Sequence, residues 1–188
     1  MIRSIFKFKW TAVYIATIPA VNYAFVHTPF IDLPDGGNFT PLSIIVGLIL
    51  VLRDFVQREI GHFVFIPLII GAILSYALAG PEIALASGLA FFISEVIDWA
   101  IYTFTKRPLS ARIMLSSMVA APIDTIVFMI GVSMTVDNFM QVSTLVAMIV
   151  SKLFGAYVVY LLVKRREKRP LETRIGNETL RPKNQRTI

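Results

Sequence analysis

Cysteine is absent from this chain, which excludes disulfide bonds and thiolate metal sites. Charged residues are also scarce: they make up 16% of the 188 residues, against 56% hydrophobic residues. A soluble domain of this size needs a polar surface, which this composition cannot supply. The strict apolar–polar alternation of a membrane β-barrel is missing as well. These absences indicate a helical membrane protein, because lipid offers no hydrogen-bond partners for the backbone N–H and C=O groups that other folds leave unpaired.

The motifs of several enzyme classes are missing too. The chain contains no His-Glu-x-x-His zinc motif, no Gly-x-Ser-x-Gly nucleophile motif and no phosphate-binding loop. We therefore expect no enzymatic activity, no catalytic residues, no cofactor and no metal site. Without a phosphate-binding loop, the chain cannot use ATP to drive transport without a partner.

Long apolar runs dominate what is present. Runs of roughly 20 residues cross a hydrocarbon core of about 30 Å as helices. The runs predict an all-α integral membrane protein with six transmembrane helices, at about residues 9–28, 40–58, 63–80, 83–105, 113–134 and 140–163. Met1–Lys9 is basic, but the apolar run after it is long enough to span, so we do not expect a cleavable signal. Residues 1–163 would form the transmembrane domain, followed by a disordered basic cytoplasmic tail at 164–188.

The net charge of +6 belongs to this tail. Residues 164–188 carry nine Lys and Arg and three acidic residues, so the remainder of the chain is neutral. A basic segment after a final helix typically faces anionic lipid. The tail has no aromatic residues for stacking on bases. We therefore expect lipid, and not nucleic acid, as its partner.

The charges in the connections orient the predicted helices. Three connections have only acidic charges, at Asp32, Asp35, Glu82 and Asp137. The basic residues outside the tail are at the other ends of the predicted spans, except one lysine inside the last span: Arg3, Lys7, Lys9, Arg53, Arg58, Lys106, Arg107 and Arg112. The positive-inside rule then places both termini in the cytoplasm of a multi-pass protein of the cell membrane.

Polar residues within the apolar runs are the candidate functional residues. They are Asn22, Glu95, Asp98, Asp124 and Lys152. One ionised group at mid-bilayer costs about 2.5–3.5 kcal/mol, so these side chains must face one another, water or a ligand. Three acids against one lysine leave charge unpaired, which favours a bound polar solute, a proton, or both. The alternative is a structural or scaffolding membrane protein in which the charges only hold helices together.

Helical spacing extends this set of candidates. Glu95 and Asp98 share a helix face with Tyr102 one turn further along. Asp54 and Arg58 are four residues apart near the membrane interface, which is the spacing of a structural or gating ion pair.

Further candidates flank two of the acids. Ser117 lies seven residues before Asp124, and Phe128 follows it by one turn. Trp99, beside Asp98, could stack on a planar ligand; packing against lipid or the protein core is the alternative.

Small residues line one face of the first predicted helix. Ala12, Ala16, Ala20 and Ala24 recur every four residues. Such a ridge permits close helix packing. It could also be a docking face for another membrane subunit.

The order of these residues resembles the VUT family of membrane proteins, described as queuosine-precursor transporters. The similarity spans about residues 10–163 and is carried by Asn22-Tyr23, Pro41, Asp54-x-x-x-Arg58-x-x-Gly61, Glu95-x-x-Asp98 with Tyr102, Ser117 to Asp124-Thr125 with Phe128, and Lys152.

The resemblance implies import of preQ0 (7-cyano-7-deazaguanine), a precursor used in tRNA modification, or of a related 7-deazapurine. It implies one central site in which Asp98 and Asp124 hold the base and Lys152 balances their charge. The family also resembles the six-helix substrate-binding subunits of energy-coupling-factor vitamin transporters. The alternative mechanism is therefore a binding subunit that needs a separate ATPase module, docked on the alanine ridge.

Overall fold

The computed structural model describes residues 8–135 and 139–179. Its α-helices are α2 (Lys9–His27), α3 (Leu42–Ile60), α4 (Phe65–Ala79), α5 (Pro81–Phe104), α6 (Leu109–Val132) and α7 (Val142–Thr179). Each predicted apolar run coincides with one of these helices, so the helix positions are confirmed; the ends differ by a few residues, except that α7 continues sixteen residues beyond the predicted end at 163.

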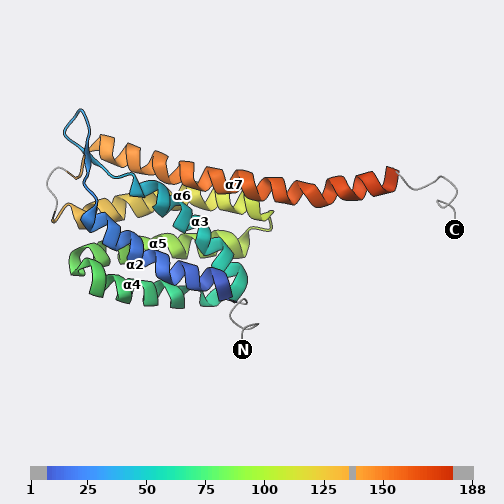
Figure 1. The fold of residues 1–188 in the computed structure, drawn as a ribbon, viewed down its shortest axis with the longest axis horizontal. Helices are drawn as coiled ribbons and strands as arrows, with labels where there is room; N and C mark the ends of the chain where they lie inside the picture. The colour runs from blue at the N-terminus through green and yellow to red at the C-terminus, as the bar shows by residue number, and fades with distance from the viewer. Residues whose placement is uncertain (1–7, 136–138, 180–188) are drawn as a thin grey trace.

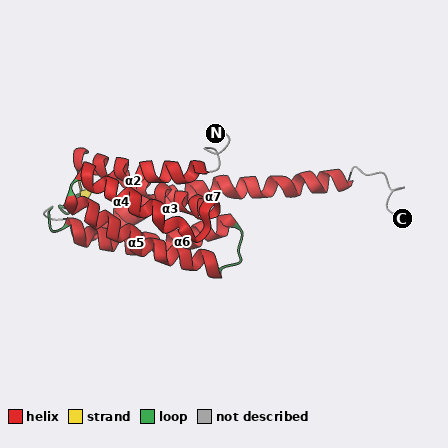
Figure 2. Cartoon of the chain, turned by 90° about the horizontal axis from the view of Figure 1, so that it is seen from below, coloured by secondary structure: helices red, strands yellow, loops and turns green. Residues whose placement is uncertain are grey.

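The helices pack side by side in a bundle (Figures 1 and 2), and their contacts close it into a ring. Going around it, the order of packed neighbours is α2, α4, α5, α6, α7, α3 and back to α2. The chain reverses direction from each helix to the next, and α2 begins at the same end from which α7 extends beyond the ring (Figure 1). A ring of this kind has an interior that side chains from all its helices can reach.

Consecutive helices α3 and α4 are not neighbours in the ring. A short 3₁₀ helix, η2 (Gly61–Val64), joins them. Gly61 has a φ of +64°, a conformation that glycine adopts without steric cost, and it ends α3 sharply. The chain can then pass α2 and place α4 on the far side of it.

Four helical segments among the described residues are long and apolar enough to cross a membrane. They are Leu42–Ala79, which contains α3, η2 and α4, then Pro81–Phe104, Leu109–Val132 and Val142–Glu167. The more polar α2 does not meet this criterion, although it completes the ring. The predicted all-helical membrane fold is confirmed at this level.

The outer surface of the ring is apolar. Ile73 is 65% exposed, Leu85 66% and Phe104 78%, and many other large apolar side chains also point outward. In water a continuous surface of this kind would aggregate. It is the surface expected of a protein embedded in lipid.

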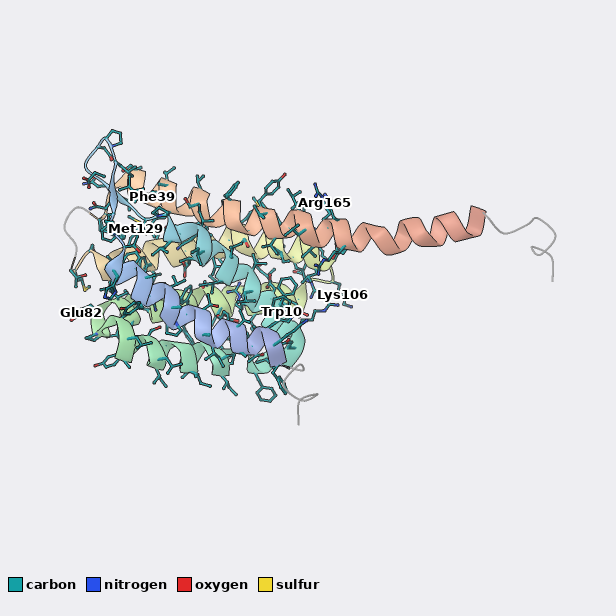
Figure 3. All side chains as sticks on the ribbon, viewed as in Figure 1. Trp10, Phe39, Glu82, Lys106, Met129 and Arg165 are labelled. Atoms are coloured by element: carbon teal, nitrogen blue, oxygen red, sulfur yellow. The ribbon has the colours of Figure 1, made fainter. Side chains whose placement is uncertain are left out.

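The two ends of the ring differ in charge and structure. A two-stranded antiparallel hairpin, β1 (Ile31–Asp32) and β2 (Asn38–Phe39), covers one end, here named the hairpin end. Phe39 and Glu82 lie at this end (Figure 3). Trp10, Lys106 and Arg165 lie at the opposite end, here named the tail end (Figure 3).

The basic tail is helical over most of its length. Helix α7 continues to Thr179 and extends away from the ring (Figure 1). Residues 164–179, which belong to the tail expected to be disordered, are helical in the structure. Residues 180–188 lie outside the described residues, as do Arg3, Lys7 and Asp137 of the predicted charge pattern.

Candidate functional site

Six charged side chains lie inside the ring. Each is 1% exposed or less: Arg53, Asp54, Glu95, Asp98, Asp124 and Lys152. A buried charge is tolerated only when it is paired and hydrogen-bonded. The structure divides these groups into two separate sets along the length of the ring.

The first set joins α6 and α7. Lys152 Nζ donates to Asp124 Oδ2 at 2.5 Å and to Thr125 Oγ1 at 2.9 Å. The other carboxylate oxygen, Asp124 Oδ1, is buried and has no hydrogen-bond partner among the described residues. An unsatisfied buried acceptor costs about 1–3 kcal/mol, so this oxygen is suited to accept a hydrogen bond from a ligand or water.

A cavity adjoins this ion pair on the side of the hairpin end. Its polar lining includes Asn22, Thr40, Ser43 and Ser87 beside Asp124 and Lys152. Asn22 is held in place because its amide Nδ2 donates to Ser75 Oγ at 3.0 Å. Ser43 Oγ is a second buried polar atom without a partner among the described residues.

Aromatic side chains cover the cavity. Phe25, Phe91 and Phe128 line it, and Phe25 and Phe128 meet edge to face with ring centroids 5.1 Å apart. Phe30 and Phe139 extend this cluster toward the hairpin end. The free space admits the centre of a water molecule over only about 20 Å³, room for about one water. The cavity in this structure therefore has no room for a ligand much larger than water.

Glycine sets the position of Lys152. A Cβ added at Gly47 of α3 would overlap the backbone of Lys152, and one at Gly155 of α7 would lie 2.6 Å from Ile44 O. These two glycines let α3 and α7 cross in backbone contact, as small residues do in membrane helices. The close crossing holds the lysine against α6.

The second set lies nearer the tail end and is here named the Arg53 cluster: Arg53 and Asp54 of α3, Glu95 and Asp98 of α5, and Tyr14 of α2. Arg53 Nη2 lies 2.7 Å from Asp98 Oδ2, and Arg53 Nε lies 3.4 Å from Glu95 Oε2. Tyr14 Oη donates to Glu95 Oε2 at 3.3 Å.

Asp54 adds a third carboxyl group, close enough to Asp98 for the two groups to interact electrostatically. The Arg53 cluster connects helices that are not neighbours in the ring, so it crosses the interior.

Arg53 is the functional candidate that the sequence analysis missed. The charge pattern predicts Arg53 at the basic end of the second span, but α3 continues to Ile60, two turns beyond it. The predicted count of three buried acids and one buried base is therefore wrong. Arg53 is a second buried base, and Asp54 is a fourth buried acid. The adjacent Arg-Asp pair inside an apolar run was the signal available in the sequence.

The predicted single site is in fact two. Asn22, Asp124, Phe128 and Lys152 line the cavity, whereas Glu95 and Asp98 do not and pair with Arg53. Lys152 contacts Asp124 but makes no ion pair with Asp98.

The expected Asp54–Arg58 ion pair is not formed. Asp54 is buried in the Arg53 cluster, whereas Arg58 is exposed on the surface of the ring. No contact within 4.0 Å joins their charged groups.

Three other predicted ligands lie away from the cavity lining. Trp99 Nε1 donates to His62 Nδ1 at 2.8 Å, toward the tail end. The ring of Tyr102 lies under the Arg112 guanidinium, with 4.1 Å between the guanidinium carbon and the ring centroid. Ser117 is buried but is not part of the cavity wall.

The described residues also provide no cluster of three or more His, Cys, Asp or Glu side chains arranged to hold a metal ion.

Comparison with known proteins agrees with this membrane-embedded polar interior. A family model described as "Putative vitamin uptake transporter" (Vut_1) matches residues 10–165. The chain belongs to this family. The match covers all of the ring and ends where α7 leaves it, so the VUT resemblance is confirmed for the whole membrane domain. No curated protein and no solved structure matches the chain. At the level that the family supports, this VUT protein is a multi-pass membrane transporter for uptake.

Proposed function

We propose that this VUT protein imports preQ0 or a related 7-deazapurine and binds it in the cavity beside Lys152 and Asp124. One observation carries the proposal. Asp124 presents a buried, unpaired carboxylate oxygen at a cavity that has aromatic walls and hydroxyl and amide groups. A small site of mostly apolar walls with a few placed polar groups is the usual form of a ligand pocket.

The chemistry of a guanine-like base suits these groups. Its ring N–H and 2-amino group are neighbouring donors, and a carboxylate provides acceptors for both. Lys152 bonds Asp124 Oδ2 and leaves Oδ1 available to the base. The faces of Phe25, Phe91 and Phe128 would stack on or enclose the planar ring.

Binding requires the cavity to widen. Space for about one water cannot hold a bicyclic base, so the closed conformation must open before substrate enters. The aromatic cluster of Phe25, Phe30, Phe128 and Phe139 stands between the cavity and the hairpin end. In the proposed cycle its side chains separate to admit substrate and close again over it.

The proposed orientation places the hairpin end outside the cell. In this arrangement all of the helices α2 to α7 cross the membrane and both termini are cytoplasmic. The support is the distribution of charge: Lys106 and Arg165 lie at the tail end and Glu82 at the hairpin end (Figure 3). Basic residues are retained on the cytoplasmic side of membrane proteins. The basic end of α7 would then face anionic lipid of the cell membrane.

The direct test is uptake of labelled preQ0 by cells that cannot make it. Cells expressing this chain are expected to accumulate label and to regain queuosine in their tRNA. Asp124→Asn should abolish both, whereas the matched control Glu82→Gln, at an exposed carboxylate, should retain them. Guanine should compete better than hypoxanthine, which lacks the 2-amino group. Absence of uptake by a well-expressed, folded protein would refute the substrate.

A second candidate mechanism is a binding subunit that works with a separate ATPase module. The observation in its favour is that Ala12, Ala16 and Ala20 are exposed on α2, so most of the alanine ridge is not used for packing within the chain. A small-residue ridge permits close approach of another membrane helix. This mechanism requires that preQ0 uptake depend on a co-expressed ATPase module and fail after Ala16→Phe; uptake by the chain without such a module refutes it.

A further inference from the structure

The Arg53 cluster holds more acid than base. Arg53 forms ion pairs with Glu95 and Asp98, and Asp54 lies beside Asp98 with Oδ2 lacking a hydrogen-bond partner among the described residues. If all three carboxyl groups were ionised, one guanidinium would leave two negative charges in the membrane interior. Each uncompensated charge there costs several kcal/mol. Uptake of a cation would lower this cost.

A proton fits this place and a metal ion does not. The guanidinium already occupies the position between Glu95 and Asp98 that a metal ion would need, at 3.4 and 2.7 Å from their oxygens. A sodium or calcium ion also requires about six oxygen ligands, which the cluster cannot turn toward one point. A proton needs one carboxylate oxygen and a nearby acceptor, and Asp54 and Asp98 supply both.

From this geometry we infer that Asp54 carries a proton whose movement across the membrane drives import. The inference rests on the proposed transport function and assigns its energy source. Asp54 is the carrier because it is the carboxyl group of the cluster that has no ion pair with Arg53. Two neighbouring carboxyl groups that share a proton are a well-known arrangement in proteins.

Asp54 is surrounded by a defined set of charged and titratable groups. From its own helix it faces Arg53, from α5 Asp98 and Glu95, and the hydroxyl of Tyr14 on α2 closes the cluster at Glu95.

Several other charged or titratable groups of the packed elements have partners elsewhere, and Arg58 of α3 and Glu82 of α5 are exposed. On α6 and α7, Asp124 and Lys152 pair with each other, and Arg112 covers the Tyr102 ring. His62 of η2 accepts from Trp99.

The position of the cluster suits coupling to the cavity. Phe91 lines the cavity and Glu95 lies one turn further along α5, which is about 6 Å at 1.5 Å per residue. On α3, Arg53 lies seven residues beyond the cavity residue Val46, or about 10 Å. The proton site is therefore next to the substrate cavity, on its cytoplasmic side in the proposed orientation.

Gln57 marks a route from the cluster to the tail end. It lies three residues beyond Asp54, on the same face of α3, and is 2% exposed. Both its amide nitrogen and its amide oxygen lack partners among the described residues. A buried amide of this kind is suited to hydrogen-bond water, and in the proposed route a water held there bridges Asp54 to the tail end.

The proton balance of one cycle is simple. In the open conformation, water from outside transfers a proton to Asp54 and forms its O–H bond. With Asp54 protonated the cluster carries one negative charge in place of two, and this lower charge allows the ring to close and reopen toward the tail end with substrate. There the O–H bond breaks, water near Gln57 takes the proton, and the carboxylate is regenerated. One substrate and one proton enter the cell together.

Purified protein in liposomes tests this step. With a pH-sensitive dye inside, addition of preQ0 outside should acidify the lumen, and initial uptake should rise as the external pH falls. Asp54→Asn, which resembles the protonated carboxyl group in shape and charge, should remove both the acidification and the dependence on pH. The control Glu82→Gln should behave as the wild type.

Infrared spectroscopy gives a readout that does not depend on the substrate. The wild-type protein should show a protonated-carboxyl band that is lost in Asp54→Asn; absence of that band from the wild type refutes the proton site. PreQ0 uptake without acidification, or uptake that requires sodium, overturns proton coupling and leaves the transport function standing. If the Asp54-dependent band is present but preQ0 is not taken up, the proton site is supported and preQ0 is refuted as the substrate.

Discussion

Removing one or both charges of the Lys152–Asp124 pair tests the cavity as a ligand site. Asp124→Asn leaves the ammonium group of Lys152 buried without a carboxylate, and Lys152→Gln leaves the carboxylate without a base. Both groups are 1% exposed and 2.5 Å apart, so each single variant leaves one buried charge without its ionic partner. Breaking a buried pair in this way costs about 3–5 kcal/mol.

The double variant separates stability from function. Asp124→Asn with Lys152→Gln leaves a neutral pair of similar size, because both charges have gone. We expect the double variant to lose less free energy of unfolding than the two single variants lose in sum. The difference should be at least about 3 kcal/mol, which is the coupling expected of residues in direct contact. Uptake should nevertheless remain absent, because the carboxylate that binds the base is missing.

The assay is equilibrium unfolding of the three variants in detergent, followed by uptake in liposomes. Single losses that simply add would show that the two charges do not stabilise each other. Recovery of uptake by the double variant would refute the role of the Asp124 carboxylate as a ligand. Recovery of stability without uptake is the predicted outcome, and it also argues against a protein in which these charges only hold helices together.

Two further predictions concern positions outside this ion pair. Gly47→Val should destabilise the protein by about 1–3 kcal/mol or more, because the added side chain meets the backbone of Lys152, which cannot move aside. Equilibrium unfolding in detergent measures this loss of stability. A variant as stable as the wild type would contradict the close crossing of α3 and α7. Asp35, at the hairpin end, accepts a hydrogen bond from Ser143 Oγ at 2.6 Å, which lowers the pKa of the Asp35 carboxyl group below its usual value. A carboxyl group with a lowered folded-state pKa stabilises the fold above its unfolded pKa of about 3.9, and this contribution is lost as the pH falls through the folded-state value. Ser143→Ala should therefore be slightly less stable than the wild type at neutral pH and equal to it in strong acid; a stability difference that does not change with pH would contradict this account.

The positions of the helices followed from local properties of the chain. In lipid each segment must satisfy its own backbone hydrogen bonds, so an apolar run of sufficient length becomes a helix whatever surrounds it. For this reason the runs at 83–105 and 113–134 coincide with α5 and α6 to within a few residues.

The helix ends were less certain, and Arg53 shows the consequence. The second run was expected to end at residue 58 and its arginines to face the cytoplasm. Helix α3 instead ends at Ile60, and Arg53 lies about 10 Å before that end. A basic residue near the end of an apolar run can reach the interface or face the interior, and the local pattern does not distinguish the two.

Amino-acid sequence alone determined that this chain is a helical membrane protein with polar residues in its interior and basic residues gathered at one end. Only the tertiary structure decided which of those polar residues meet. The ring order α2, α4, α5, α6, α7, α3 brings α6 beside α7 and α3 across from α5, so Asp124 faces Lys152 while Glu95 and Asp98 face Arg53. Partners of this kind depend on the rotation of each helix about its axis and on its neighbours, and these are set by packing between distant segments.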